Sequence, residues 1–494
     1  MCIILALASL VSAYFMIPFL QDRAYTNPSV LELPWEHDAA GAGWVLSSLA
    51  KGGLFDAGRF PSLTLLAGLG LGYCAWRWRQ AHLRTLAAMS LFWLLLFFGS
   101  PTWGALLDRL PMGAAIDFHR RIMALHLGGL YLMGVGLAWP WRWALARANR
   151  LFLLAPAALT LLLLFPVYQE RIAYFQQNVA WMHESAAAAQ AERQDLDALM
   201  GAIRERGPGR VYAGLPARWG GEIKIGAVPL YAYLNGERLE MLGFLYHALS
   251  LNADLSMLFD DGKLEQYQLF NVRYVITPQG WTVPAFYTPL GDYGRFRLYE
   301  VPSGGYFDLV DSDMAFVGRT GDFYAAASTW LNSDLLRAKQ HPTIALGAAP
   351  LGYPALYPLD EAPAEIPLMA TTPGGYRGEI LSETVGSNRY EAEVEVERES
   401  WLMLKVTYHP GWRAYVNGER AETVMLMPSY VGVRLPPGQH TVRLVYSGGA
   451  GRVWLMALGL LTLALLWLAE RRPDLAARLR ERLLGKPRHK SRRR

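Results

Sequence analysis

Six apolar windows limit what this chain can fold into. They lie near residues 2–20, 61–78, 83–100, 121–139, 150–167 and 452–469. A hydrocarbon core about 30 Å thick is crossed by about 20 apolar residues of helix. The composition, 52% hydrophobic and only 18% charged, is too apolar for an ordinary globular surface. The sequence therefore predicts a membrane α-helical bundle with about six transmembrane helices.

Clusters of basic residues predict how these helices are oriented. Two short connections each carry three arginines and no acid, namely Arg77, Arg79 and Arg84, then Arg142, Arg147 and Arg150. The tail 471–494 carries eleven Lys or Arg against two acidic residues. The positive-inside rule places all three in the cytoplasm and segments 21–60, 101–120 and 168–451 outside. Because the tail follows an apolar helix, we expect it to contact membrane lipid and no nucleic acid.

The large outer region divides into two kinds of pattern. Helical stretches at Glu184–Arg206 and Arg238–Leu251 alternate with short β-type runs at Arg210–Ala213, Val272–Thr277 and Arg295–Val301, which predicts an extracytoplasmic α/β module. From about residue 378, apolar and polar residues alternate, as they do in half-buried antiparallel strands. Further strands at 401–408, 413–416, 431–435 and 440–446 predict a C-terminal antiparallel β-sandwich.

These patterns predict five segments. Residues 1–167 form a five-helix membrane domain, 168–375 the α/β module and 376–448 the β-sandwich. Residues 452–469 form the last transmembrane helix, and 470–494 the basic cytoplasmic tail. The first window lacks a basic stretch before it and a small-residue cleavage site after it. It therefore resembles an internal helix more than a removable signal peptide, and we expect a truncated or late-starting chain.

Candidate chemical groups cluster in the outer loops. Motifs for nucleotide hydrolysis and zinc binding are missing from the sequence. In loop 21–60, the carboxylates of Asp22, Glu36 and Asp38 are candidates to act as a general base on an acceptor hydroxyl. They are also candidates to hold a divalent metal ion, although no residue is assigned as a metal ligand. The alternative is an acidic loop that is simply solvated.

Basic residues at the fourth window form a second candidate group. Arg120 and Arg121 flank its outer end, where an arginine pair is suited to a lipid-linked phosphate. His126 lies about two turns inside the window, on the same helix face as His119. Two alternatives stay open. The arginines can reach the interface simply because their long side chains extend to water, and His126 can be a neutral, hydrogen-bonded residue of the bundle.

The C-terminal sequence resembles a known family. Residues 408–418, YHPGWRAYVNG, and 432–442, GVRLPPGQHTV, are similar to the end of YfhO-type bacterial membrane proteins. Weaker similarities lie at 269–276, LFNVRYVI, and 118–121, FHRR. The resemblance implies a relative of GT-C glycosyltransferases in the bacterial cytoplasmic membrane. Such enzymes move a sugar from a polyprenyl-phosphate donor to an envelope polysaccharide or glycolipid acceptor.

The sequence also differs from the GT-C superfamily in one respect. In that superfamily the catalytic carboxylate lies in the first outer loop of a larger helical domain, whereas here five spans in the order of the family's later helices precede the soluble region. This implies a chain without the catalytic half of the membrane domain. The competing function is a non-enzymatic, membrane-anchored scaffold that binds a glycan or a protein during envelope assembly.

Overall fold

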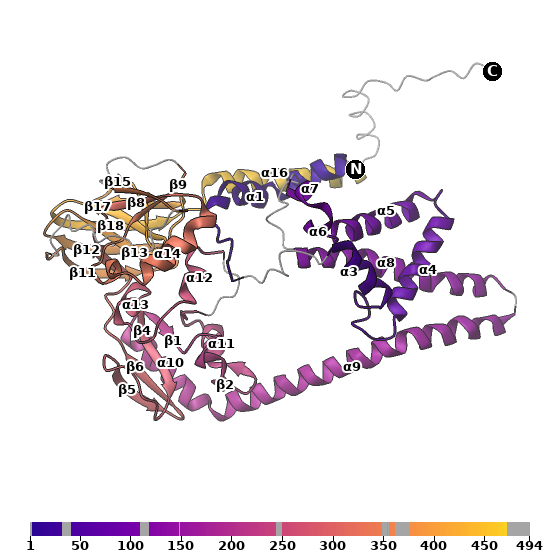
Figure 1. Ribbon diagram of the computed structural model, residues 1–494, viewed down its shortest axis with the longest axis horizontal. Coiled ribbons are helices and arrows are strands. Elements are labelled where there is room, and N and C mark those ends of the chain that lie inside the picture. The colour runs from indigo at the N-terminus through magenta and orange to yellow at the C-terminus, as the bar shows by residue number, and fades with distance from the viewer. Residues whose placement is uncertain are drawn as a thin grey trace, which may run out of the picture. The chain divides into compact units, whose positions relative to one another are not determined.

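The chain forms two compact units. The computed structural model describes residues 2–31, 41–108, 118–147, 149–243, 249–347, 353, 355–360 and 375–471. One unit combines Met1–Ser29 with Glu192–Arg494, and the other is Val30–Ala191. We call the first the sheet unit and the second the helix unit. Figure 1 shows the elements of both.

All six apolar windows coincide with helices. These are α1 (Cys2–Gln21), α4 (Ser62–Trp76), α5 (Ala81–Leu96), α8 (Phe118–Leu145), α9 (Leu154–Ala191) and α16 (Ala450–Arg471). In the described part of the chain, four candidate spans are long and apolar enough to cross a membrane: Ile4–Gln21, Ile122–Leu145, Arg150–Ala191 and Gly451–Arg471. Helices α4 and α5 have 15 and 16 residues, or about 23 Å each. The predicted apolar helices are thus confirmed, and the count of six spans stays a prediction.

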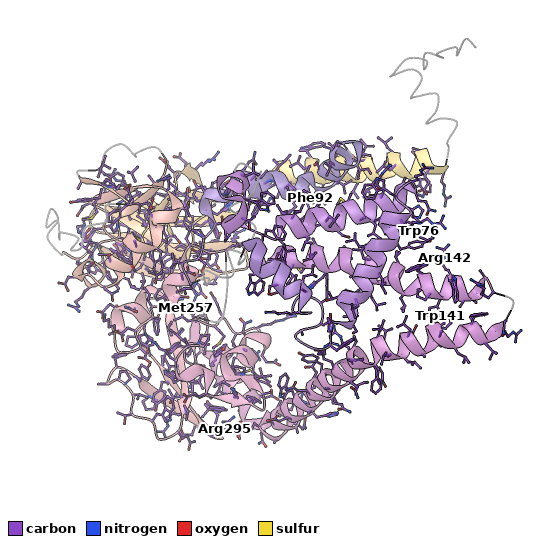
Figure 2. All side chains as sticks on the ribbon, turned by 45° about the vertical axis from the view of Figure 1, so that its right-hand side comes forward. Trp76, Phe92, Trp141, Arg142, Met257 and Arg295 are labelled. Atoms are coloured by element: carbon purple, nitrogen blue, oxygen red, sulfur yellow. The ribbon has the colours of Figure 1, made fainter. Side chains whose placement is uncertain are left out.

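The helix unit is held together by close helix contacts. Besides α4, α5, α8 and α9 it contains the short helices α3 (Gly41–Ala50), α6 (Ser100–Trp103) and α7 (Ala105–Asp108). Buried residues from four helices, including Leu66, Cys74, Leu132 and Leu163, form its core. Large apolar side chains such as Trp76 and Phe92 cover the outside, where they are 67% and 53% exposed (Figure 2). An apolar outer surface of this kind is suited to lipid.

The first and last helices pair within the sheet unit. α1 and α16 lie side by side along their length (Figure 1). Gly459 of α16 makes the close approach possible, because a Cβ at this position would lie 3.0 Å from the Val11 carbonyl oxygen of α1. Small residues at such contacts allow helix backbones to approach in lipid. The two ends of the chain therefore share one helical pair.

The other α-helices in the described part of the sheet unit are short. They are α10 (Arg193–Arg206), α11 (Leu230–Gly236), α12 (Asn252–Ser256), α13 (Leu264–Leu269), α14 (Phe323–Leu331) and α15 (Asp334–Arg337). The predicted helix Glu184–Arg206 is divided between the end of α9 and α10. The prediction of a helix over Arg238–Leu251 is wrong for its described residues, which form turns, bends and an isolated β-bridge from Met241 to Val211. Arg238 and Gly243 there adopt φ angles of 67° and 76°, which a right-handed helix excludes.

Two small sheets lie in the first part of the sheet unit. The larger has the order β1 (Arg210–Tyr212), β4 (Val272–Pro278), β6 (Phe296–Glu300) and β5 (Thr288–Tyr293). β2 (Lys224–Ile225) and β3 (Val228–Pro229) form a two-stranded hairpin. The three predicted β-type runs correspond to β1, β4 and β6.

A seven-stranded sheet and a five-stranded sheet form the rest. The first has the order β10 (Ala355–Pro358), β8 (Met314–Gly318), β9 (Thr343–Leu346), β16 (Val424–Leu426), β17 (Tyr430–Leu435), β13 (Ser400–Thr407) and β7 (Phe307–Val310). The second is antiparallel, in the order β11 (Gly378–Val385), β12 (Arg389–Val396), β18 (Gly438–Tyr446), β14 (Trp412–Val416) and β15 (Glu419–Ala421).

One apolar core joins these two sheets. It combines Ala392 and Val394 of β12 with Leu402 of β13 and Val433 of β17. The alternation predicted for 390–397 is confirmed, since Ala392, Val394 and Val396 are buried while Glu393 is exposed. The seven-stranded sheet also contains β7, β8, β9 and β10, which precede residue 376 in the sequence. Within it, β8 pairs in parallel with β9 and β10. An antiparallel C-terminal sheet region is thus confirmed, and the finer assignment as a β-sandwich stays a prediction.

Candidate functional site

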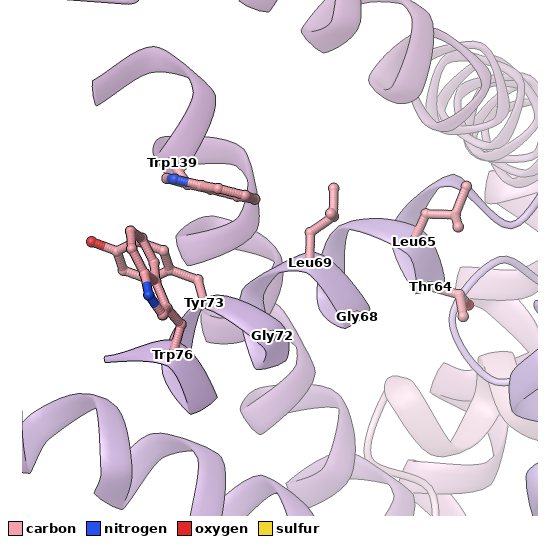
Figure 3. Close-up of a pocket in the computed structure, with 8 residues that line it drawn as sticks. All are labelled: Thr64, Leu65, Gly68, Leu69, Gly72, Tyr73, Trp76 and Trp139. Atoms are coloured by element: carbon pink, nitrogen blue, oxygen red, sulfur yellow. The ribbon is translucent and has the colours of Figure 1, made fainter. Parts of the chain in front are cut away.

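An apolar groove of about 550 Å³ follows α4 in the helix unit. It is lined by Thr64, Leu65, Gly68, Leu69, Gly72, Tyr73, Trp76 and Trp139 (Figure 3). From Thr64 to Trp76 the helix rises about 18 Å, more than half of a hydrocarbon core. Gly68 and Gly72 lie one turn apart, and a Cβ built on either would meet no atom within 4 Å. The groove therefore exists because these two positions carry no side chain.

Three aromatic rings close one end of the groove. Tyr73 lies 5.9 Å from Trp76 and 5.9 Å from Trp139 between ring centroids, and the two tryptophans are 6.5 Å apart. Figure 3 shows Trp139 of α8 facing Tyr73 and Trp76 of α4. Clusters of this kind favour tilted and edge-on contacts. They give the groove a rigid end wall.

Polar groups gather at the other end, where α4 begins. The buried Asp56 carboxylate accepts hydrogen bonds from the backbone N–H of Leu63 (2.8 Å) and of Thr64 (3.0 Å). Arg59 pairs with Glu170 at 2.9 Å through Nη2. Its Nε and Nη1 are buried and have no hydrogen-bond partner among the described residues. Asp56 thus caps the start of α4. Arg59 precedes Thr64 by five residues in the sequence, and two nitrogens of its guanidinium stay without a partner among the described residues.

Asp22 lies in a separate cluster, at the end of α1 in the sheet unit. Its Oδ2 is 3.2 Å from His409 Nε2 and 3.7 Å from Arg452 Nη2. The Tyr25 ring contacts the rings of Tyr408 and His409 at centroid distances of 5.8 and 6.0 Å. Burial, followed by the charge of Asp22, raises the pKa of the Tyr25 hydroxyl. We call Asp22, Tyr25, Tyr408, His409 and Arg452 the anchor cluster.

Both ring nitrogens of His409 are engaged. Nδ1 accepts a hydrogen bond from the Gly411 backbone N–H at 2.9 Å, and Nε2 faces Asp22. A neutral imidazole with its proton on Nε2 satisfies both contacts and has no lone pair left to accept a substrate proton. The anchor cluster therefore joins the strand loop 408–411 to α1, and general-base catalysis by Asp22 stays a prediction.

The hairpin that follows this loop has the predicted geometry. β14 and β15 are joined at Asn417 and Gly418, whose φ angles of 52° and 88° match an Asn-Gly turn. Residues 378–454 match the family model for the bacterial membrane protein YfhO. This YfhO segment contains β11 to β18 and the start of α16, and it confirms the resemblance predicted from its motifs. No curated protein and no solved structure matches the chain. Together with the apolar helices, the YfhO segment identifies a membrane protein.

The other predicted site residues have different outcomes. Glu36 and Asp38 lie outside the described residues, as do the side chains of His119, Arg120 and Arg121. His126 Nε2 lies 2.8 Å from the Leu54 carbonyl oxygen, and its ring contacts Phe55. This is a hydrogen bond within the bundle, as one of the two alternatives for His126 expects. Substrate binding by these residues stays a prediction.

The divalent metal ion predicted for the acidic loop stays a prediction, because Glu36 and Asp38 lie outside the described residues. Around Asp22, a ring nitrogen of His409 and the Arg452 guanidinium both lie within 4 Å of Oδ2. Among the described residues, no group of three or more His, Cys, Asp or Glu side chains is arranged to hold a metal ion.

Sequence reasoning missed the groove and Arg59. The signal was the run Gly68-Leu69-Gly70-Leu71-Gly72 in the second apolar window. Glycines four apart share one helix face, and the glycine between them points to the opposite face. Gly70 packs against α8, while Gly68 and Gly72 open the groove. The pattern could have been recognised, but only a structure shows that nothing fills the space.

Proposed function

We propose that this chain acts in GT-C-type sugar transfer and binds a polyprenyl-phosphate sugar donor in its helix unit. The groove along α4 carries the proposal. It is apolar over about 18 Å, and its lining includes the exposed side chains of Leu65 and Trp76. It begins at Thr64, five residues after Arg59, whose guanidinium has two nitrogens without a partner among the described residues. An amphiphile with a long apolar chain and one phosphate fits this distribution of groups.

The apolar part of the groove is suited to an isoprenoid chain. Branched chains need width at regular intervals, and the two glycines supply it on one side of α4. The aromatic end wall adds contacts with large apolar area. Lipid-linked donors owe much of their affinity for a membrane protein to such contacts, while the headgroup determines specificity.

The polar end is suited to the donor phosphate. Arg59 belongs to loop 21–60, which we expect outside the cytoplasm from the pattern of arginines in the short connections. Transfer at the outer face of the cytoplasmic membrane would then bring the donor sugar to the side of the large outer module. That module would bind the envelope polysaccharide or glycolipid acceptor.

Filling the groove is the test of this proposal. We expect Gly68→Trp combined with Gly72→Trp to weaken binding of a long-chain polyprenyl phosphate at least tenfold, because indole rings occupy the chain's place. A tenfold change corresponds to about 1.4 kcal/mol. Binding is measured by titration of the full chain in nanodiscs.

Gly134→Trp is the matched control. Gly134 lies on α8, a Cβ there also meets no atom within 4 Å, and the residue does not line the groove. Equal affinity in the wild type, the groove double variant and this control would contradict donor binding in the groove.

The non-enzymatic scaffold remains the second candidate, because the anchor cluster favours it. Asp22, predicted as a candidate base, is already paired with His409 and Arg452. As a structural residue it should tolerate Asn: we expect Asp22→Asn to reduce the free energy of unfolding by about 1 kcal/mol or less. Sugar transfer by the full chain should change less than about threefold.

A different result would reassign Asp22. Loss of a general base typically lowers a rate by about 10²–10⁴-fold. Such a loss in Asp22→Asn at unchanged melting temperature would place this carboxylate in the reaction. If the wild type transfers no sugar from the donor but retains an envelope glycan, the scaffold is the better assignment.

A further inference from the structure

A second hollow, of about 430 Å³, lies on the YfhO segment beside β14 and β15. Unlike the groove, it is lined mainly by polar side chains. Arg413, Arg420, Glu422 and Thr423 contribute them, and Pro410 forms part of the wall. Nothing in the transfer function proposed above uses these residues.

Positive charge is concentrated in and next to the hollow. Ion pairs in the described part of the YfhO segment engage Arg389, Arg398, Arg434 and Arg452, but neither Arg413 nor Arg420. Both guanidinium groups are therefore open to an external anion. Planar guanidinium donors match phosphate oxygens in pairs, which makes two adjacent arginines a suitable phosphate site.

A third arginine reinforces this charge. Tyr415 of β14 is in register with Arg420 on one side and with Arg443 of β18 on the other. The Arg443 guanidinium lies 4.8 Å from the Tyr415 ring centroid, and its Nε is buried without a hydrogen-bond partner among the described residues. Arg420 of β15 and Arg443 of β18 thus lie on either side of Tyr415, two residues along β14 from Arg413, and Glu391 of β12 is in register with Arg443 on its other side.

The hollow lies close to the membrane-facing end of the sheet unit. Pro410 directly follows His409, which contacts Asp22 at the end of α1. Asp22 also contacts Arg452, at the start of the candidate span Gly451–Arg471. The candidate span Ile4–Gln21 ends directly before Asp22, which touches the loop that forms the wall. The candidate span Gly451–Arg471 has Arg452 as its second residue, and Arg452 touches Asp22. A ligand in this hollow would lie at the level of lipid headgroups.

We infer that the hollow binds the headgroup of an anionic phospholipid that carries hydroxyl groups beside its phosphodiester. Arg413 and Arg420 bind the phosphate, and Glu422 and Thr423 hydrogen-bond the hydroxyls. The Glu422 carboxylate disfavours a bare, doubly charged phosphate and favours a ligand with donors next to a single negative charge. Such a contact would hold the outer module at the surface of an anionic membrane.

The experiment titrates the full chain in nonionic detergent with dihexanoylphosphatidylglycerol, followed by calorimetry. We expect saturable binding that falls at least tenfold in the double variant Arg413→Gln, Arg420→Gln. The control is Arg389→Gln with Arg434→Gln, two exposed arginines that pair with Glu391 and Glu399. The control should bind as the wild type does.

Three further ligands identify the source of the phosphate. Dihexanoylphosphatidylcholine lacks the hydroxyls and the net charge, so tight binding of it would overturn the inference. Inorganic phosphate or glycerol 3-phosphate binding as tightly as the lipid would also overturn it, in favour of a soluble phosphate ligand. Equal lipid affinity in the wild type and the Arg413/Arg420 double variant would exclude the hollow as the site. None of these results depends on sugar transfer.

Discussion

Replacing Asp308 with alanine should destabilise the sheet unit by about 3–5 kcal/mol, because it leaves a buried lysine unpaired. Asp308 of β7 contacts Lys339 Nζ at 2.7 Å and faces Lys405 Nζ at 3.8 Å. The Lys405 side chain is only 1% exposed, and its Nζ has no hydrogen-bond partner among the described residues. Urea unfolding of the full chain in detergent, followed by tryptophan fluorescence, measures the change.

Lys339→Ala is the control, since this lysine is 42% exposed and its pairing should contribute about 1 kcal/mol or less. A second variant, Asp308→Leu with Lys405→Met, should recover most of the loss by removing both buried charges. Equal destabilisation by Asp308→Ala and Lys339→Ala would show that Asp308 does not stabilise the buried charge of Lys405.

The same carboxylate gives the sheet unit a pH dependence of known sign. Burial raises the pKa of Asp308, but Lys405 and Lys339 outweigh burial, so the pKa lies below its ordinary value. The stability that Asp308 contributes is therefore present above an unfolded pKa of about 3.9 and is lost as pH falls through the folded pKa. The Asp308→Ala variant should lack this part of the acid-induced loss.

Replacing Gly70 with leucine should separate α4 from α8 and destabilise the helix unit by about 3 kcal/mol, the upper end of typical overpacking. A Cβ on Gly70 would lie 1.8 Å from the Leu132 carbonyl oxygen, and one on Gly136 would lie 2.2 Å from the Leu66 carbonyl oxygen. Backbone meets backbone at this crossing, so no side-chain rotation relieves the clash. The midpoint of thermal aggregation in detergent reports the loss.

Gly68→Leu and Gly72→Leu are matched controls on either side, because both positions are open. We expect each to change the aggregation midpoint far less than Gly70→Leu does. A series in which all three variants aggregate at the same temperature would contradict the contact between α4 and α8.

Local patterns predicted most of the secondary structure. The alternation at 390–397 was enough to predict β12, because apolar side chains on one face of a strand are stabilised by burial in a core. The Asn417-Gly418 pair sufficed for the hairpin, because both residues tolerate positive φ. The helix predicted over Arg238–Leu251 failed for the opposite reason, since apolar periodicity does not reveal that Arg238 adopts a left-handed backbone conformation.

The sites depended on contacts that local patterns do not contain. Asp22 was recognised as a carboxylate near the membrane, but its pairing with His409 and Arg452 joins residues from opposite ends of the chain. Whether a carboxylate acts as a base or as a structural partner depends on such contacts. The groove was equally hidden, because the sequence shows glycines but not the absence of a neighbouring side chain.

Photo-crosslinking with a polyprenyl phosphate that carries a diazirine in its isoprenoid chain tests donor binding most directly. We predict that the labelled peptides come from Thr64–Trp76 of α4 and from the part of α8 around Trp139, and that Gly68→Trp with Gly72→Trp abolishes this labelling. Donor binding in the groove would be contradicted by labelling that is spread evenly over lipid-exposed helices such as α1 and α16 and that is unchanged in the groove double variant.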